Sequence, residues 1–253
     1  MEFLITHIDT WLPLLFFVVA FVYSSVGMGG GSSYTALMVL TGFSTLAIPM
    51  VSLSLNLLVT TLGSYNFLRN RHGKWRIIMP FLLSAIPFAY VGGALQLPKS
   101  VFLWVLLASL LLVAARIYLW QNTSFNLQLS PKQKIGVSLF AGSILGLIAG
   151  IVGIGGGVYL VPLIIMLNLG TAKQAAAAGV VFVWVVSLSG LVSRLQYNSI
   201  DLLNYVPLIG AVLIGGFLGS YWGSFKYSPK TLEKVLGVII LAAIGFLLKK
   251  LLF

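Results

Sequence analysis

The sequence predicts an all-α polytopic membrane protein built from two homologous four-segment repeats, with about eight membrane segments in all. Of the 253 residues, 59% are hydrophobic and 8% are charged, whereas soluble domains are about 45–50% apolar and about 25% charged. The apolar runs are continuous rather than alternating, which favours helices over a transmembrane barrel. A glycine-rich stretch, VGMGGGSSYTALM at 26–38, returns 126 positions later as VGIGGGVYLVPLI at 152–164 and divides the chain into halves.

The few charged residues lie in the connections between the apolar runs. Fifteen are Lys or Arg and four are Asp or Glu, which gives a formal net charge of +11. Cations in short connections are typical of positive-inside anchoring and of contact with anionic lipid headgroups. We therefore expect membrane lipids as partners and no nucleic acid. The absence of cysteine excludes disulfides, thiol catalysis and cysteine-based metal sites.

The first half, residues 1–121, begins with a segment that is too long for one straight crossing. Trp11 to Leu40 is an uncharged run of 30 residues that contains the first glycine cluster. As a single helix it would be about 45 Å long, against a hydrocarbon core of about 30 Å. The length and the glycines together predict a broken helix or a re-entrant hairpin. Three ordinary spans follow, at Leu46–Leu68, Ile77–Leu97 and Val101–Trp120.

The second half, residues 135–253, repeats this plan after a polar linker at 122–134. Its first segment, Ile135–Leu169, is uncharged and holds the second glycine cluster. The spans predicted after it are Ala175–Ser193, Leu202–Phe225 and Leu232–Phe253, with a connecting loop, RLQYNSID, at 194–201. Internal repeats of this kind are typical of secondary transporters.

Two topologies fit this pattern. If each long segment crosses once, there are eight crossings and the repeats are parallel. If each long segment is a re-entrant hairpin, each half has three full crossings, the repeats are inverted and both termini are outside. Counting basic residues does not decide between them, and segment length alone favours the hairpin. Both place the connections at 69–76 and 116–134 in the cytoplasm, and we expect a multi-pass protein of the cell (inner or plasma) membrane.

The glycine clusters have two interpretations. Glycines can unwind a helix, which exposes backbone N–H groups and a half-helix N-terminus that binds anions. Two such breaks facing each other would hold one anion without a charged side chain. Alternatively, Gly27/Gly31 and Gly153/Gly157 are GxxxG pairs that serve close helix packing. Three consecutive glycines at matching positions exceed what packing needs, so the pattern favours a binding site.

Polar residues near the clusters complete the predicted site. Asn56, in the span after the first cluster, is the most informative, because a buried amide in mid-membrane is costly unless it is paired. It either contacts the ligand or makes a helix–helix bond. The equivalent stretch of the second half, 175–190, is mostly apolar, so we expect an asymmetric site. The predicted substrate-binding residues are Gly27, Gly29, Gly30, Gly31, Ser32, Ser33, Tyr34, Asn56, Gly153, Gly155, Gly156, Gly157 and Tyr159.

Several kinds of residue are missing from the predicted spans. None has Asp, Glu, Lys, Arg or His at its centre, so coupling to protons either uses the substrate's own protonation or is absent. No nucleophile lies beside a base, and no cluster of metal ligands is evident. We therefore expect a protein that is not an enzyme and that has no metal and no cofactor.

Four stretches, in this order, resemble the TauE/SafE sulfite exporter family, also called the toluene sulfonate uptake permease family. They are VGMGGGSSYTALM, LNLLVTTLGSYNFLRNRHGKW, IAGIVGIGGGVYLVPLII and GTAKQAAAAG. The resemblance implies a prokaryote-type inner-membrane carrier for a sulfur-containing anion such as sulfite, sulfoacetate or another sulfonate. The stretch after GTAKQ is poorer in polar residues than the resemblance leads us to expect.

Together, the residues and the resemblance predict a secondary transporter that binds a small anionic substrate between two glycine breaks. Two alternatives stay open: a channel for anions or small solutes, and a non-transporting membrane subunit in which the glycines serve packing alone. The sequence also leaves open whether two copies pair as a homodimer.

Overall fold

The computed structural model describes residues 11–25, 29–69, 74–119, 129–198, 202–222 and 229–252, and every element within them is helical. The predicted all-α class is thereby confirmed. Four described helices are long and apolar enough to cross a membrane: α4, α5, α6 and most of α8. The elements are α1 (Trp11–Ser25), α2 (Gly31–Leu40), α3 (Ala47–Arg69), α4 (Trp75–Ala94), α5 (Lys99–Tyr118), α6 (Pro131–Val152), α7 (Gly157–Met166), α8 (Ala172–Tyr197), a 3-10 turn η1 (Leu202–Tyr205), α9 (Val206–Trp222) and α10 (Pro229–Leu252).

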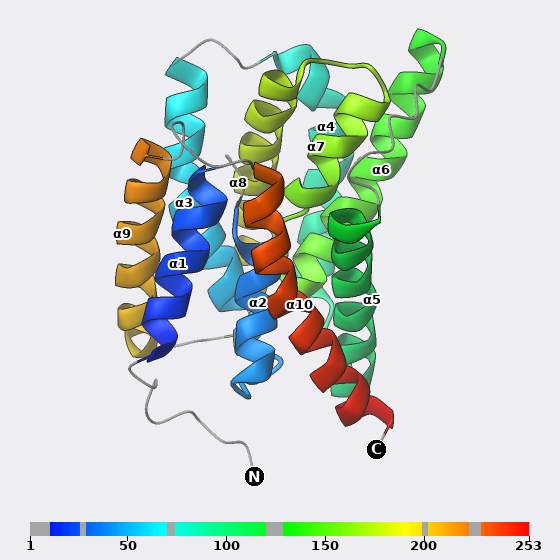
Figure 1. Cartoon of the computed structure of the whole chain (residues 1–253). Coiled ribbons are helices and arrows are strands. Elements are labelled where there is room, and N and C mark those ends of the chain that lie inside the picture. Colours follow the sequence, from blue (N-terminus) through cyan, green and yellow to red (C-terminus); the bar gives the residue numbers. More distant parts are fainter. Residues whose placement is uncertain are drawn as a thin grey trace.

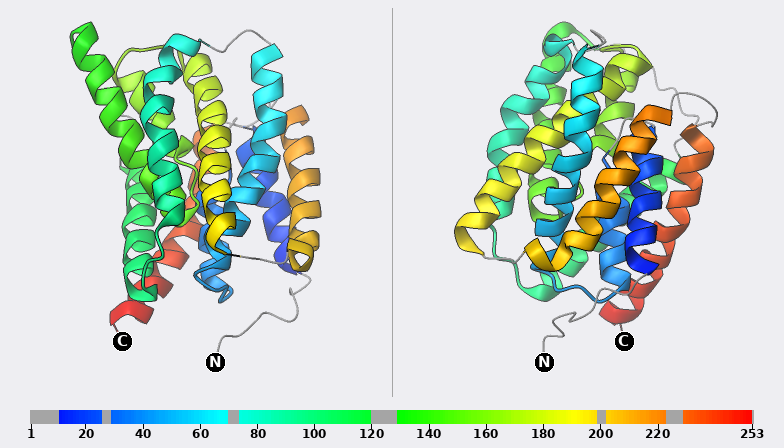
Figure 2. Two further views of the ribbon diagram at one scale, coloured as in Figure 1. Left: turned by 180° about the vertical axis from the view of Figure 1, so that it is seen from behind. Right: turned by 90° about the vertical axis from the view of Figure 1, so that its left-hand side faces the viewer.

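The helices form a bundle with two distinct ends (Figure 1). We call the end where α1 begins and α10 finishes the terminal face, and the other end, where α3 finishes and α6 begins, the opposite face. Helix α1 runs inward from the terminal face and α2 runs back toward it, while α6 runs inward from the opposite face and α7 returns toward that one (Figures 1 and 2). Each pair is therefore a helix, a break and a shorter helix that reverses direction.

Glycine conformation explains where the second pair is broken. Helix α6 ends at Gly153, with φ of 86°, and α7 starts after Gly156, with φ of 73°. Both lie in the left-handed region, which glycine adopts readily and other residues do not. The predicted segment Ile135–Leu169 is therefore two helices with glycines between them. In the first pair, α1 ends at Ser25 and α2 begins at Gly31.

A second group of glycines brings helices into close contact. A Cβ atom at Gly146 of α6 would lie 2.3 Å from the carbonyl oxygen of Ala85 in α4. A Cβ at Gly219 of α9 would lie 2.2 Å from the carbonyl oxygen of Phe21 in α1. Backbones that approach this closely leave no room for a side chain. The same close approach of a neighbouring backbone is found at Gly142, Gly150 and Gly215, so the spacings Gly142/Gly146/Gly150 and Gly215/Gly219 serve helix packing, while Gly223 lies outside the described residues.

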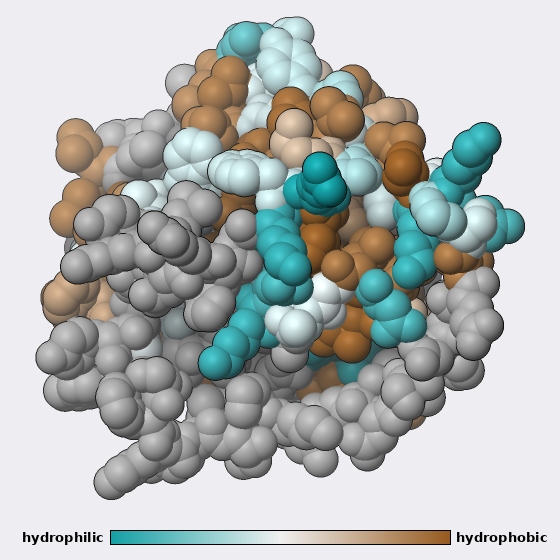
Figure 3. All heavy atoms as spheres, turned by 90° about the horizontal axis from the view of Figure 1, so that it is seen from above, coloured by the Kyte–Doolittle hydropathy of each residue, from teal (hydrophilic) through white to brown (hydrophobic). Residues whose placement is uncertain are grey.

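The outer surface of the bundle carries exposed apolar side chains along its length, and exposed cations lie at its ends. Large apolar side chains are exposed on most helices, among them Leu83, Phe140 and Phe217. Viewed onto the opposite face, hydrophilic residues gather over the helix ends (Figure 3). Four exposed cations, Lys74, Arg76, Lys132 and Lys173, lie at helix starts on this face, and two more, Lys249 and Lys250, lie in the last turn of α10 on the terminal face. This distribution is the one expected of helices surrounded by lipid.

One predicted boundary is wrong. The sequence places residues 194–201 in a connecting loop, but α8 continues to Tyr197, so Arg194 is helical and buried. The apolar run ends at Ser193, and a charged residue there resembles the beginning of a loop. The helix continues because the Arg194 side chain finds carbonyl partners inside the bundle.

Candidate functional site

The two glycine breaks meet in the interior of the bundle. A Cβ atom at Gly31 would lie 2.4 Å from the carbonyl oxygen of Ile154, so the backbones of the two breaks are in direct contact. Residues 30–39 and 151–158 are all buried. Segments more than 120 positions apart in the sequence therefore form one buried cluster at the point where both helix pairs reverse.

Asn56 of α3 lies against both breaks. Its Nδ2 donates a hydrogen bond of 3.1 Å to the carbonyl of Gly153. Cβ atoms built at Gly29 and Gly155 would each lie 3.0 Å from the Asn56 amide. The Oδ1 atom is buried and has no hydrogen-bond partner among the described residues. An unpaired buried acceptor costs about 1–3 kcal/mol, so this atom is a candidate for contact with a ligand.

Val183 of α8 lies against the same two glycines as Asn56, but it approaches them from α8 instead of α3. Cβ atoms at Gly29 and Gly155 would lie 3.0 Å and 2.9 Å from its Cγ1. The side-chain oxygens of Ser44 and Thr171 accept backbone N–H bonds at the starts of α3 and α8. Counted from these two residues, Asn56 and Val183 are both 12 positions along. Each glycine break thus faces one amide and one apolar side chain at equivalent helix positions.

Two half-helices begin at this cluster without side-chain caps. Helices α2 and α7 each have 10 residues, and their N-caps, Gly30 and Gly156, supply no side-chain oxygen. By contrast, α6 and α8 begin at the opposite face with full capping boxes, Ser130/Gln133 and Thr171/Gln174. The positive ends of α2 and α7 are thus directed at the buried cluster, where an anion would be stabilised by their N–H groups.

Hydroxyl groups surround the first break. The Tyr23 hydroxyl is hydrogen-bonded with Ser32 at 2.9 Å and with Ser33 at 3.2 Å. Ser52 donates to the Gly153 carbonyl at 2.8 Å and lies 3.4 Å from the Gly31 carbonyl, so it links the two breaks. Hydroxyls of this kind can donate to an oxyanion after a small rotation.

Tyr34 fills the space beside Gly30. Its ring is fully buried and stacks on Phe16 with centroids 5.3 Å apart. A Cβ atom at Gly30 would lie 2.5 Å from the ring, so this position needs glycine. The Tyr34 hydroxyl is buried and has no partner in the part of the chain that the structure describes. It is the second unpaired polar group close to the first break.

The structure brings most of the predicted site residues together, with two exceptions. Gly29, Gly30 and Gly31, with Ser32, Ser33, Tyr34 and Asn56, lie with Gly153, Gly155, Gly156 and Gly157 in the cluster. The Tyr159 hydroxyl instead donates to the Ser109 carbonyl of α5 at 2.6 Å. Gly27 lies outside the described residues.

Three residues of the cluster are not among the site residues that the sequence predicts. Ser52 lies one helical turn before Asn56, and this spacing could have placed it on the same face. Tyr23 and Val183 carry no local signal, because only the tertiary contacts bring them to the breaks. Within the described ranges, no group of three His, Asp or Glu residues could hold a metal ion.

Comparison with known proteins identifies the family. The family model described as "Sulfite exporter TauE/SafE" matches residues 12–247. The chain belongs to this family. "Probable membrane transporter protein y4hK" of Sinorhizobium fredii is 34% identical over 92% of this chain and 95% of its own length. "Probable membrane transporter protein MJ0441" of Methanocaldococcus jannaschii is 25% identical over 90% of this chain and 92% of its own length. No solved structure matches.

This TauE/SafE family member is thus similar over nearly its whole length to proteins named as membrane transporters, and not to enzymes. Its apolar helices agree with a multi-pass membrane protein. The glycine breaks lie well inside the matched region, as do Asn56 and Val183.

Proposed function

We propose that this protein is a secondary transporter for a small sulfur-containing anion, such as sulfite, sulfoacetate or another sulfonate. The anion binds between the two glycine breaks. One observation carries this proposal: two uncapped half-helix N-termini, of α2 and α7, converge on a buried amide whose Oδ1 is unpaired in the described structure. Membrane transporters of other folds bind anionic substrates at the N-termini of broken helices in the same manner.

The proposed site uses neutral donors. First-turn N–H groups of α2 and α7 bind the oxygens of the anion, helped by the hydroxyls of Ser32 and Ser33. Among the described side chains of the cluster none is charged, so discrimination rests on shape and on hydrogen bonds. The Asn56 Oδ1 accepts a hydrogen bond, and an oxyanion that carries one proton can supply it. A singly protonated anion therefore suits the site better than a dianion.

We also propose that residues 1–121 and 135–253 are inverted repeats joined by the polar linker at 122–134. Two observations support this. The pairs α1–α2 and α6–α7 open toward different faces, and Asn56 and Val183 have equivalent positions in α3 and α8 (Figure 1). The cations at 74, 76, 132 and 173 favour the opposite face as the cytoplasmic one. The connections at 69–76 and 116–134 are then cytoplasmic, the termini are outside, and the membrane is the inner or plasma membrane.

Transport through this point requires the two breaks to separate. The contact between Gly31 and Ile154 closes the path between the faces, and the hydrogen bonds from Ser52 and Asn56 to Gly153 hold it closed. Rocking of one helix pair against the other would open the cluster to one face at a time. While the anion is bound, the Asn56 amide hydrogen-bonds to the anion instead of to the Gly153 carbonyl.

Uptake into proteoliposomes tests the function. Purified protein is reconstituted, and uptake of radiolabelled sulfite, sulfoacetate and a sulfonate is measured with and without unlabelled anion inside. A carrier gives uptake that saturates and that accelerates in counterflow. Flux without saturation or counterflow would instead indicate a channel, and no flux of any of these anions would indicate a non-transporting subunit. A C-terminal reporter tests the topology, since inverted repeats require an external C-terminus.

A further inference from the structure

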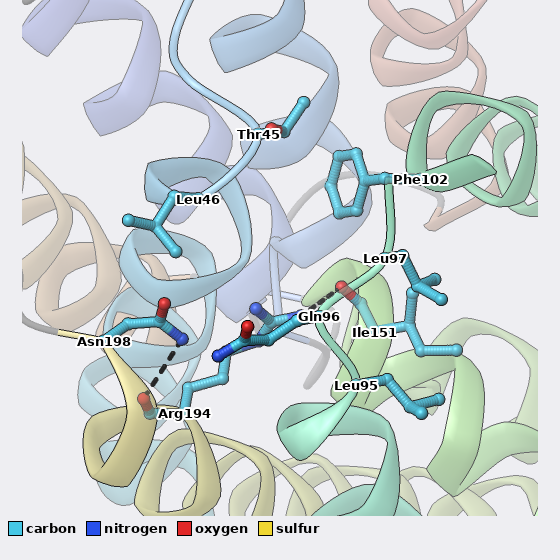
Figure 4. Close-up of a pocket in the computed structure, with 9 residues that line it drawn as sticks. All are labelled: Thr45, Leu46, Leu95, Gln96, Leu97, Phe102, Ile151, Arg194 and Asn198. Atoms are coloured by element: carbon cyan, nitrogen blue, oxygen red, sulfur yellow. Dashed lines mark hydrogen bonds between the residues drawn. The ribbon is translucent and has the colours of Figure 1, made fainter. Parts of the chain in front are cut away.

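A second polar region lies on the terminal face, on the outer side of the glycine cluster. It is a cavity of about 170 Å³ between the start of α3, the end of α4 and the end of α8 (Figure 4). Its polar lining comes from Thr45, Gln96, Arg194 and Asn198, and no acidic residue lines it. Ile151, near the end of α6, forms part of its wall. The cavity therefore adjoins the second glycine break from the terminal side.

Arg194 places a positive charge at the inner end of this cavity. Only 6% of the residue is exposed. Its Nε and Nη2 donate to the Gly150 carbonyl at 3.1 Å and 3.0 Å, and Nη2 also donates to the Ile151 carbonyl at 2.6 Å. In the described part of the chain Arg194 is hydrogen-bonded to carbonyl oxygens and to no carboxylate. These carbonyls belong to the last turn of α6, whose partial negative charge offsets a full cation only in part.

A guanidinium has five N–H donors, and the carbonyl bonds use those on Nε and Nη2. The two donors on Nη1 have no hydrogen-bond partner among the described residues. Gln96 lines the same cavity as Arg194, and the Asn198 side chain donates to the Arg194 carbonyl at 3.4 Å (Figure 4). The arrangement combines a cation of low hydration with neutral amide donors, which suits an oxyanion.

We propose that this cavity is the site at which the anion is first bound on the terminal face, and that Arg194 selects for negative charge there. This inference rests on the proposed transport of an anion and adds a second binding site to it. The carbonyls that hold Arg194 lie two and three positions before Gly153, the residue that ends α6. An anion that attracts Arg194 toward the cavity weakens these bonds and frees the end of α6. Binding at the face is thereby coupled to opening of the breaks.

The test is the KM for uptake, measured from each face in vesicles of known protein orientation. Replacing Arg194 with Gln should raise the KM from the terminal face about tenfold to a hundredfold, the loss expected for a hydrogen bond to a charged group. The KM from the opposite face should change less than about twofold, because that path does not begin at this cavity. Arg76→Gln, which removes an exposed cation on the opposite face, is the matched control and should leave the terminal-face KM unchanged.

A second pair of variants keeps the Arg194–carbonyl bonds intact. Gln96 is exposed, so both Gln96→Glu and Gln96→Lys should fold. The carboxylate should raise the terminal-face KM and the ammonium should lower it. If wild-type protein transports the anion but neither Gln96 variant shifts the KM, the cavity proposal is overturned and the proposed function stands. If Arg194→Gln lowers the maximal rate equally from both faces at constant KM, Arg194 only holds α6 against α8. Absence of wild-type transport would overturn both proposals.

An anionic lipid headgroup offers the same chemistry as a soluble oxyanion. The assays are therefore repeated in vesicles of phosphatidylcholine alone and in vesicles that contain phosphatidylglycerol. KM shifts that persist in phosphatidylcholine alone support a soluble anion. Shifts confined to vesicles with phosphatidylglycerol would assign the cavity to a lipid headgroup and overturn the proposal.

Discussion

The first glycine break is surrounded by hydroxyl groups, whereas the second depends on backbone conformation. Around the first, Tyr23, Ser32 and Ser33 form a hydrogen-bonded group, and Gly30 has an ordinary φ of −84°. In the second, Gly153, Gly155 and Gly156 all have φ between 73° and 86°. The same three letters, GGG at 29–31 and at 155–157, therefore have two different backbone conformations.

The difference continues in the helices that face the breaks. Asn56 of α3 brings an amide to the cluster, and Val183 of α8 brings two methyl groups to the equivalent place. Near the second break, the Tyr159 hydroxyl is bonded to α5. The first half of the chain thus supplies polar side chains, and the second half supplies a left-handed glycine backbone that presents the N-terminus of α7. The glycine motif is present in both halves, but the polar side chains around it come mainly from the first half.

The largest expected effect is a loss of stability when Gly153 is replaced by Ala. In Gly153→Ala, left-handed strain costs about 1–2 kcal/mol, and overpacking against Pro49, whose Cα would lie 2.8 Å away, adds about 1–3 kcal/mol. Thermal unfolding in detergent should show a clearly lowered midpoint. Gly42→Ala is the matched control, because Gly42 has a φ of 78° but nothing within 4 Å of an added Cβ.

In Gly42→Ala the free energy of unfolding should therefore fall only by the cost of left-handed strain, about 1–2 kcal/mol. A Gly153→Ala variant no less stable than Gly42→Ala would mean that the second break tolerates side chains. The contrast between a polar first break and a backbone-determined second break would then be wrong.

The next largest effect is on uptake, and it distinguishes the role of Asn56 from that of Val183. Asn56→Val makes α3 resemble α8, and kcat/KM for uptake should fall about tenfold to a hundredfold, as for a lost hydrogen bond of about 1.5–3 kcal/mol to a charged group. Stability should change little, because the variant removes a hydrogen bond and an unpaired acceptor together. The control is Ser54→Ala on the same helix, whose hydroxyl bonds only to its own helix at Met50.

Val183→Asn is the complementary variant. If the amide is needed on one particular side, Val183→Asn in an Asn56→Val background should restore little of the uptake. Full restoration would show that the two sides are interchangeable, and retained uptake in Asn56→Val alone would remove Asn56 from the proposed site.

These contrasts define how far the sequence could predict the structure. The all-α class follows from the length and composition of the apolar runs. The second helix break follows from its glycines, because few other residues adopt the positive φ of Gly153, Gly155 and Gly156. Asn56 stands out because an amide is rare in such a run. Val183 could not be identified, since a valine in an apolar helix carries no signal until the fold places it opposite Asn56. Arg194 was assigned to a loop because its carbonyl partners come from α6, 43 and 44 residues earlier.

The smallest expected effects come from the two tyrosines near the breaks. Tyr159→Phe removes the hydrogen bond to Ser109 and should lower the free energy of unfolding by about 1 kcal/mol, with an unchanged KM. Tyr34→Phe removes a hydroxyl with no partner in the described structure, so stability should stay the same or rise slightly. If that hydroxyl binds the anion, KM should rise about fivefold, which corresponds to about 1 kcal/mol.

Each tyrosine variant is the control for the other, because both lose one buried hydroxyl from a helix that begins at a glycine break. Denaturation and uptake are measured on the same preparations. An equal loss of stability in both variants, with KM unchanged in both, would assign both hydroxyls to packing. The opposite pattern, in which Tyr159→Phe alone raises KM, would move the substrate toward α5 and the second break. Only a KM effect confined to Tyr34→Phe agrees with a site whose polar side chains come from the first half of the chain.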